Sequence, residues 1–390
     1  MKKYNIFSNL YMLLMILFLF EPNIFVKYSS INYLYIGGAV LSLITIILLL
    51  IKKSIKPKKP IIFVIIWKLI ALFTTIIYSG DILKCGYQSV VLITLVLYAE
   101  YFYETKRIDV FLGKLNTIFN VYLTINFITY LLYPTGIYAE AHNLYFLGIR
   151  TRFTEYAFAA IVTAISCYKC KKISKFSLVY TIIVCVLNII LPNIGTAYVG
   201  IIIALLSYII LNGIFLKKKN TKFGRYIVLG SLIATILIVF FRIQDIFSVI
   251  IVNLLHKDLT LTERTLIWDR TIPIIKSSHY ILGNGYSNDG NFVLFGNGLW
   301  QAHNQLLQLL YEVGFIGTFA FYNYILASFS ITKKNTKYMN LIIAFAVAIL
   351  IMMITEIYSY YLPTFVIFII LYYREAFDNI SEYKGEMKND

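Results

Sequence analysis

Apolar runs of membrane-spanning length alternate with short polar connections along most of this chain. A helix that crosses the hydrocarbon core of a bilayer needs about 20 consecutive apolar residues. Runs near that length fall at residues 7–26, 31–51, 61–79, 87–103, 115–133, 154–168, 176–191, 196–216, 226–241, 305–331, 339–356 and 360–373. The pattern predicts an all-α, polytopic integral membrane protein, a single membrane domain over 1–390 with about 12 transmembrane helices.

One polar interruption is much longer than the others. It covers residues 242–304, between the ninth and tenth predicted helices. A second polar segment covers 134–153, and a polar tail covers 374–390. Polar backbone and charged side chains are not stable against lipid, so both internal segments must lie outside the hydrocarbon or line a wet cavity. We therefore expect the working site in the 242–304 loop.

Composition supports the membrane assignment, and the distribution of charge orients the chain. Hydrophobic residues make up 59% of the sequence and charged residues 14%, which excludes a soluble globular protein. The net charge of +16 suggests nucleic acid, but 25 of the 35 Lys and Arg lie on the face that holds both termini. The positive-inside rule makes that face cytoplasmic, including the 374–390 tail. The loops 134–153 and 242–304 are then extracytoplasmic, and we expect no nucleic-acid partner.

Arginine is concentrated on the opposite, external face. Arg150 and Arg152 lie in the shorter external loop, and Arg264 and Arg270 lie in the longer one. The planar guanidinium group presents a fork of donors that matches phosphate geometry. Any one of these side chains is equally explained by a surface salt bridge. As a group of four they favour an anionic ligand.

All four histidines, His142, His256, His279 and His303, also fall on the external side. Histidine titrates near neutral pH and serves as a proton acceptor, but most isolated loop histidines have no such role. We assign no function to the first three. His303 differs because it directly precedes a predicted helix, and a rigid element is where a catalytic group is held most accurately.

A short helix is predicted inside the long loop, over residues 262–270. Thr260 or Thr262 is available as an N-cap, and Pro273 comes close to the end. Such a helix, lying along the outer membrane surface, would turn Trp268 and its apolar neighbours toward the interface and hold the guanidinium groups above it.

Several spaced residues of this region together resemble a known family. They are Arg264-x3-Trp268, Pro273, Gly283-x-Gly285, Ala302-His303-Asn304-x-x-Leu307, Glu312-x-Gly314 and Gly317. The set resembles the motif core of the O-antigen ligases and Wzy-type polysaccharide polymerases. The resemblance implies a polytopic enzyme of the bacterial cytoplasmic (inner) membrane with a large external loop between late helices. It also implies glycan transfer from an undecaprenyl-diphosphate carrier, with external arginines on the diphosphate and His303 as base.

The chemistry of such a transfer fits the residues present. A lipid diphosphate is an activated leaving group, so the enzyme needs cations to neutralise negative charge and a base to deprotonate a sugar hydroxyl. If His303 only orients the substrate, Glu155 or Glu263 replaces it as the base. The predicted catalytic residues are His303, Arg264, Arg270 and Glu263; the predicted substrate-binding residues are Arg150, Arg152, Glu155, Trp268 and Asn304.

The sequence offers no metal-ligand cluster and no Gly-rich nucleotide loop, so we expect no metal and no other cofactor. Cys167 and Cys170 have the spacing of a redox or metal pair, but they stand alone at a cytoplasmic helix end. Lys68 and Glu312 fall inside predicted spans and are functional candidates for that reason, although either could snorkel or pair within the bundle.

Three functions remain open, and we expect the first. It is a polymerase that joins lipid-linked oligosaccharide repeat units on the outer face of the membrane, for capsule, O-antigen or exopolysaccharide. An O-antigen ligase shares the chemistry and differs in its acceptor. A lipid-linked oligosaccharide flippase would instead place its charges in a central cavity between repeated halves. Expected partners are the lipid-linked glycan, the bilayer, and the flippase and chain-length regulator of the same pathway.

Overall fold

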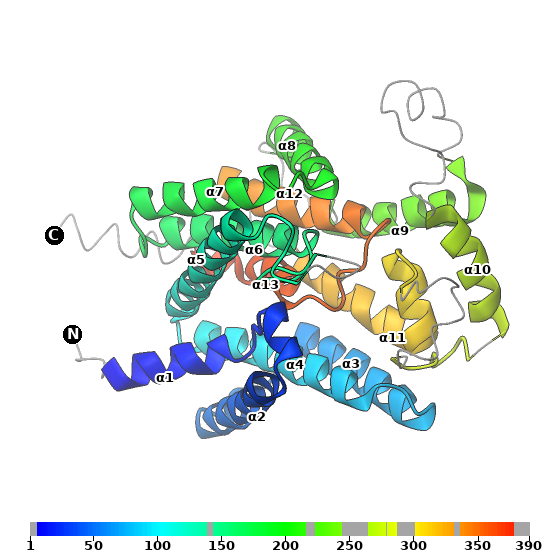
Figure 1. The fold of residues 1–390 in the computed structure, drawn as a ribbon, viewed down its shortest axis with the longest axis horizontal. Helices are drawn as coiled ribbons and strands as arrows, with labels where there is room; N and C mark the ends of the chain where they lie inside the picture. Colours follow the sequence, from blue (N-terminus) through cyan, green and yellow to red (C-terminus); the bar gives the residue numbers. More distant parts are fainter. Residues whose placement is uncertain are drawn as a thin grey trace.

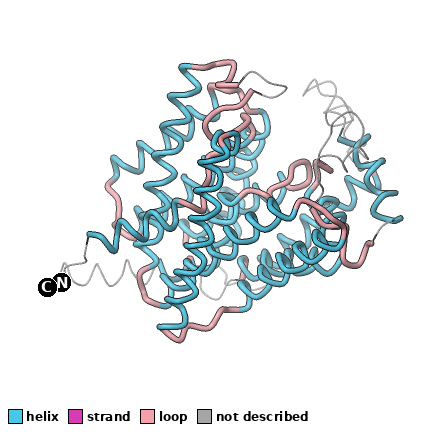
Figure 2. The backbone as a smooth tube through the Cα atoms, turned by 60° about the horizontal axis from the view of Figure 1, so that its bottom comes forward, coloured by secondary structure: helices cyan, strands magenta, loops and turns pink. Residues whose placement is uncertain are grey.

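The computed structural model describes residues 6–138, 143–215, 223–243, 264–277, 279–286, 301–330 and 336–377. Over this part of the chain the structure is helical, with two isolated bridges and no strand (Figures 1 and 2). The helices are α1 (Ile6–Leu17), η1 (Asn23–Lys27), α2 (Ser29–Lys52), α3 (Lys59–Ile77), α4 (Ile82–Glu104), α5 (Ile108–Leu132), α6 (Arg152–Lys169), α7 (Lys175–Ile190), α8 (Gly195–Phe215), α9 (Phe223–Phe241), α10 (Arg264–Ser277), α11 (Gln305–Ser328), α12 (Lys337–Met352) and α13 (Leu362–Tyr373).

Each of the twelve predicted runs contains a helix, but the count of twelve transmembrane helices is not confirmed. Seven of the described helices are long and apolar enough to cross a membrane: α2, α3, α4, α5, α8, α9 and α11. The first and last helices, α1 and α13, have 12 residues each, about 18 Å of rise against a hydrocarbon core of about 30 Å. The chain is therefore a multi-pass membrane protein whose helices differ in length.

The first predicted span is shorter in the structure for a local reason. Helix α1 ends at Leu17, and the chain turns through Glu21 and Pro22 into the short helix η1. Proline fixes its own φ and lacks the backbone N–H that a continuing helix needs, so the apolar run 7–26 does not form one straight helix. Hydropathy alone does not register that turn.

The bundle is built around helices that are buried on all sides. In α13 the ten residues from Pro363 to Tyr373 other than Tyr372 are buried, and this helix packs on α6, α12, α11 and α4. Helices α3 and α11 pack along each other, with the Trp67 and Phe321 rings 4.9 Å apart. On α2, α8 and α9 many large apolar side chains are exposed, as expected for surfaces that face lipid.

Helix α11 is broken at Gly314, whose φ of 57° and ψ of −163° are not helical. The segment 279–286 fills the break with its own backbone. A Cβ atom on Gly314 would lie 2.3 Å from the Ile281 carbonyl oxygen, so only glycine fits there. The bonds that close the break run from the Asn284 amide to the Tyr311 carbonyl (2.7 Å), from Gly285 to Glu312 (2.9 Å), from Phe315 to Tyr280 (2.9 Å) and from Ile316 to Ile281 (3.2 Å).

This close backbone contact explains why glycines occur both in the inserted segment and in the helix that receives it. Gly283 and Gly285, with φ of 84° and 76°, lie in the inserted segment, and Gly314 lies in the helix that receives it. The Tyr286 carbonyl accepts from the Asp81 amide (2.9 Å), and the Tyr286 amide donates to Thr75 Oγ1 (2.9 Å). This anchors the return of the long loop between α3 and α11.

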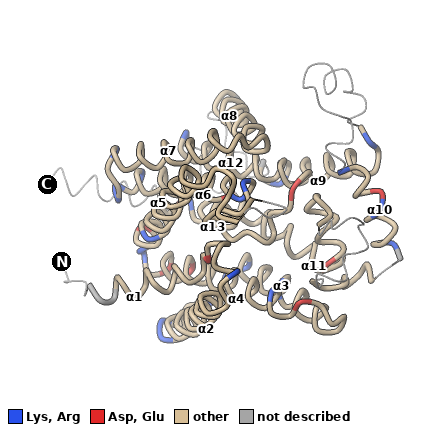
Figure 3. The backbone as a smooth tube through the Cα atoms, viewed as in Figure 1, with Lys and Arg blue, Asp and Glu red and all other residues tan. Residues whose placement is uncertain are grey.

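Charge and apolar surface are separated along the molecule. Figure 3 shows that Lys, Arg, Asp and Glu lie mainly at helix ends and in connections, with long uncharged stretches between them. Helix α10 lies at the end of the long axis away from α1 (Figure 1). It packs against α11, and Val239, Ile267, Trp268, Ala302 and Leu307 are part of a small apolar core there, separate from the main one.

Candidate active site

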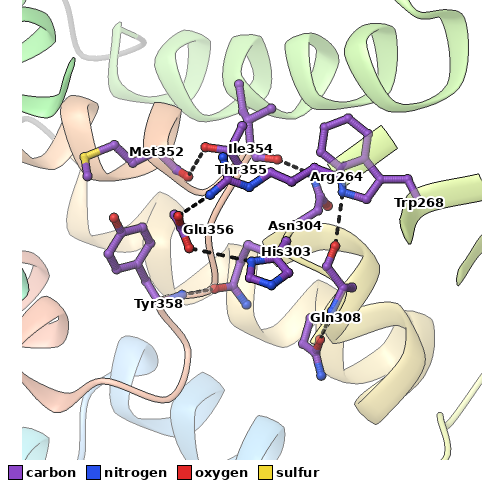
Figure 4. A network of polar contacts seen from close by, with 12 residues as sticks. Arg264, Trp268, His303, Asn304, Gln308, Met352, Ile354, Thr355, Glu356 and Tyr358 are labelled. Atoms are coloured by element: carbon purple, nitrogen blue, oxygen red, sulfur yellow. Dashed lines mark hydrogen bonds and ion pairs between the residues drawn. The ribbon is translucent and has the colours of Figure 1, made fainter. Parts of the chain in front are cut away.

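The start of α11 is fastened to the connection between α12 and α13. Asn304 caps the helix: its Oδ1 accepts from the Leu307 amide (2.9 Å), and its Nδ2 donates to the Ile354 carbonyl (2.8 Å). Gln305 Oε1 accepts from the amides of Tyr358 (2.7 Å) and Ser359 (2.9 Å). Two consecutive side chains of α11 thus fix the position of residues 353–361 (Figure 4).

The backbone just before the cap is also fixed by hydrogen bonds. Trp268 Nε1 donates to the Ala302 carbonyl (3.1 Å), and the Ala302 amide donates to Gln308 Oε1 (2.9 Å). His303 follows with a φ of 46°, in the left-handed region that non-glycine residues seldom adopt. Such a conformation costs of order 1–3 kcal/mol and persists only where the surroundings impose it. The imidazole is therefore positioned by its neighbours.

His303 and Arg264 converge on one carboxylate, that of Glu356 (Figure 4). Arg264 Nη2 lies 2.5 Å from Glu356 Oε1, and His303 Nδ1 lies 3.9 Å from Oε2. The second distance is an electrostatic contact rather than a hydrogen bond. The side chains are 20% (Arg264 and Glu356) and 31% (His303) exposed, so the group is partly open to its surroundings.

The start of α6 brings two more predicted residues to the same carboxylate. The Arg152 guanidinium carbon lies 3.1 Å from the centre of the Tyr361 ring, and Arg152 interacts electrostatically with Glu155 and Glu356. Glu155 is buried, at 4% exposure. Burial, with these two carboxylates nearby, raises the pKa of Tyr358 well above its usual range, so its hydroxyl stays neutral. Residues from the start of α6, from α10 and from the turn before α11 therefore interact with Glu356 of the 353–361 connection.

Other predicted site residues have different positions. Arg150 is exposed in the turn before α6, and Arg270 is exposed on α10. At about 100° per residue, Arg270 points roughly 120° away from Arg264 around that helix. Trp268 and Asn304 are fully buried and bonded inside the protein, where they support His303. Glu263 lies outside the described residues.

Glu356 was missed at the sequence level. It closes the apolar run 339–356 and was counted inside a span. In the structure α12 ends at Met352, so Glu356 lies in the connection that follows. An acidic residue at the end of an apolar run, beside the polar residues Thr355 and Ser359, was the available signal.

The predicted intramembrane charges Lys68 and Glu312 lie beneath this site, at 0% and 2% exposure. Gln308 Nε2 donates to Glu312 Oε1 (2.9 Å) and contacts the Tyr360 hydroxyl (2.8 Å), which itself donates to Glu312. Lys68 Nζ donates to Tyr286 Oη (3.1 Å) and attracts Glu312 electrostatically. Because Gln308 also holds the Ala302 amide, this buried network supports the backbone at His303.

The remaining candidates show no comparable convergence. The His279 ring stacks on Tyr78 with centroids 4.4 Å apart, while His142 and His256 lie outside the described residues. Cys167 and Cys170 are buried free thiols. Over the part of the chain that the structure describes, no three His, Cys, Asp or Glu side chains form a metal-binding group.

Comparison with known proteins places this geometry in context. Residues 180–322 match the model of a family described as O-antigen ligase. The matched range includes α10, the inserted segment and the first part of α11, and therefore Arg264 and His303. Neither a curated protein nor a solved structure matches the chain.

Proposed function

We propose that this multi-pass membrane protein, a member of the O-antigen ligase and polymerase family, is a glycan polymerase. It joins oligosaccharide repeat units that are carried on undecaprenyl diphosphate, at the outer face of the bacterial cytoplasmic membrane, with both termini in the cytoplasm. The observation that carries the proposal is the convergence of Arg264 and His303 on Glu356 at the start of α11.

The donor side of the reaction needs positive charge. When the bond between the anomeric carbon and the diphosphate oxygen breaks, the leaving lipid diphosphate gains negative charge, which guanidinium groups stabilise. Arg264 is the principal candidate, because its present partner is a partly exposed carboxylate for which a phosphate can substitute. Arg152 adds a second cation close to the same carboxylate.

The acceptor side needs a base, and His303 supplies it. With Nδ1 facing Glu356, the imidazole keeps Nε2 for the acceptor hydroxyl. The acceptor oxygen bonds to the anomeric carbon, its proton passes to Nε2, and undecaprenyl diphosphate leaves with the electron pair of the broken bond. The Glu356 carboxylate stabilises the imidazolium that forms, as a carboxylate does beside other catalytic histidines.

Two observations favour an enzyme over a flippase. The charged group lies at helix ends and in a connection, while a transporter concentrates such groups at discontinuous helices near the bilayer midplane. The broken helix α11 is filled by protein backbone, residues 279–286, rather than left to line a path. A ligase shares the donor and base chemistry, and only the acceptor separates it from a polymerase.

The test is deletion of the gene followed by analysis of surface glycan and of extracted lipid-linked intermediates. Loss of the long glycan ladder with single repeat units still reaching the outer face supports the polymerase. Long polymer retained on its lipid carrier indicates a ligase instead, and units confined to the inner leaflet indicate a flippase. Complementation with His303→Ala should reproduce the deletion, while Cys167→Ala should restore the ladder.

A further inference from the structure

A single buried side chain, that of Gln308, joins the two segments that carry the candidate base and its carboxylate. Gln308 lies in the first turn of α11 and is 1% exposed. Its Oε1 accepts from the Ala302 amide, 2.9 Å away, directly before His303. Its Nε2 donates to the Tyr360 hydroxyl, 2.8 Å away, in the connection that also carries Glu356.

The partners of Gln308 determine how its amide group is oriented. The Ala302 N–H can only donate, so it must face the Gln308 oxygen and not the NH2 group. The NH2 group then donates to Glu312 Oε1 (2.9 Å) and to the Tyr360 hydroxyl, which itself donates to the same carboxylate. A flipped amide or an apolar side chain at this position would lose the bond to Ala302.

The inserted segment supports both groups that accept from Gln308. The Tyr286 and Tyr360 rings meet edge to face, with centroids 5.6 Å apart. The Glu312 carbonyl accepts from the Gly285 amide (2.9 Å). Both acceptors are thus fixed to another part of the bundle, which gives the Gln308 amide a rigid base.

The geometry of His303 requires such a restraint. Its φ of 46° lies in a region that non-glycine residues seldom adopt. Its Nδ1 lies 3.9 Å from Glu356 Oε2, too far for a hydrogen bond, so this contact does not orient the ring. The restraint comes from the preceding backbone, where Trp268 holds the Ala302 carbonyl (3.1 Å) and Gln308 holds the Ala302 amide.

We propose that Gln308 is a positioning residue that holds His303 opposite Glu356. It does so by joining the backbone before the base to the connection that carries the carboxylate. The inference rests on the proposed function, in which His303 is the base. Because Gln308 is buried inside the protein, it acts through His303 and not on the glycan. Its loss should therefore slow the chemical step and leave the affinity for the lipid-linked glycan unchanged.

The first test is Gln308→Met, an unbranched apolar replacement that removes these bonds. The assay measures undecaprenyl diphosphate released from purified lipid-linked repeat units, per folded molecule in nanodiscs. The kcat should fall by up to about 10²-fold, the cost of misplacing a catalytic group by about 1 Å. The KM should stay within about twofold of wild type. In a His303→Ala background the same change should cost less than about twofold, because the group it positions is absent.

Asn340→Leu is the matched control. Asn340 is a fully buried side-chain amide near the start of α12, at the opposite end of that helix from the Glu356 connection, and it donates to Asn212 Oδ1 (3.0 Å). Its replacement removes a buried amide bond as Gln308→Met does. It should lower the unfolding temperature and leave kcat unchanged.

An exchange of two side chains provides the conservative variant. Gln308→Glu combined with Glu312→Gln keeps an acceptor for the Ala302 amide and a donor between the two side chains, and it conserves the charge. This double variant should retain much more of the wild-type kcat than Gln308→Met does. Equal losses in the two proteins would contradict a role that depends on these hydrogen bonds.

A measurement without turnover separates this inference from the polymerase proposal. In protein isotopically labelled at histidine, the NMR signal of the His303 imidazole is assigned by its absence from His303→Ala. It should shift or broaden in Gln308→Met and stay unchanged in Asn340→Leu. Tyr360→Phe keeps the ring but loses the hydroxyl bonded to Gln308; it should have the same effect, and it replaces Gln308→Met if that variant does not fold.

The outcomes distinguish the two proposals. A displaced His303 signal in Gln308→Met, from a wild type that transfers no glycan, supports the positioning role and contradicts the polymerase. An unchanged His303 signal overturns the positioning role even if the wild type makes polymer. Losses that add fully between Gln308→Met and His303→Ala overturn it as well.

Discussion

Two arginines at different places in the bundle show how the same side chain serves two purposes. Arg264, at the start of α10, pairs with the Glu356 carboxylate and is 20% exposed. Arg374, directly after α13, is 1% exposed and donates to the backbone carbonyls of Ser328 (3.1 Å), Leu371 and Ser330. The partner of Arg264 is a charged, partly exposed side chain, whereas the partners of Arg374 are carbonyl groups at helix ends.

The two sites differ in how well the partner groups remain solvated or bonded when the arginine no longer contacts them. Carbonyls in the last turn of a helix have no partner inside the helix, so releasing Arg374 would leave several of them buried and unsatisfied. Glu356 has a second neighbour, His303, and is itself 20% exposed, so releasing Arg264 would leave a carboxylate that water still reaches. Arg374 therefore stabilises the fold by capping helices, while the role we propose for Arg264 is to bind a phosphate.

The largest effect is expected from His303→Ala. Removal of a general base typically costs 10²–10⁴-fold, so polymer formed from purified lipid-linked repeat units should fall by about 10³-fold. The thermal unfolding temperature should not fall, because alanine at φ of 46° loses only a side chain that was 31% exposed. Wild-type rates in this variant would remove His303 from the mechanism.

The comparison between the arginines is tested directly by Arg264→Ala and Arg374→Ala. Arg264→Ala should lower turnover by about 10²–10³-fold, the usual cost of one group that stabilises developing negative charge, and leave stability nearly unchanged. Arg374→Ala should lower yield and the unfolding temperature, while the folded fraction keeps its specific activity. Turnover per folded molecule and thermal unfolding in nanodiscs distinguish the two. Reversed results would overturn the division of roles.

A smaller effect is expected from Glu356→Gln. The amide keeps the shape of the side chain but loses the charge that holds Arg264 and stabilises the His303 imidazolium. We expect turnover to fall by less than the roughly 10³-fold expected for His303→Ala, because the base itself remains. The double variant Glu356→Gln/His303→Ala is informative, because the two losses should not add if the carboxylate acts through the imidazole. Additive losses would show that Glu356 does not act through His303.

The sequence predicted most of the helices and named three residues of the group around Glu356, and the physical reasons differ. Hydropathy located the apolar helices because burial in lipid or in a packed core demands apolar side chains over whole segments, while α10 was expected from its capping residues. It did not register the turn at Glu21 and Pro22, which depends on local backbone geometry. Arg264, His303 and Arg152 were predicted from residue type and position. Glu356 was not, because its role arises from a contact with a residue 92 positions earlier.

Burial also changed the interpretation of two predicted substrate contacts. Trp268 and Asn304 have the residue types of a glycan-binding surface, and nothing in one sequence distinguishes an exposed indole from a packed one. In the structure both side chains are used up by hydrogen bonds to the backbone around His303. We therefore assign them to positioning the base rather than to touching the glycan.

The smallest effect on chemistry is expected at the end of the bundle opposite the candidate site, from Lys58→Met. Lys58 Nζ lies 3.2 Å from Glu100 and 2.6 Å from Glu104, and its ammonium group covers the Tyr103 ring at 4.0 Å. This is another charged group shared by carboxylates, but both carboxylates stand on α4 and no histidine is among its partners. Methionine keeps the apolar stem and removes the charge.

The change should lower the unfolding temperature, because the Glu100 side chain is 0% exposed and would lose its cation, while the partly exposed Glu104 would lose little. Turnover per folded molecule should stay within about twofold of wild type, in contrast to Arg264→Ala. A large loss of turnover in a stable Lys58→Met protein would show that charge at this end of the bundle contributes to the reaction. The distinction between a structural end and a chemical end of the bundle would then be wrong.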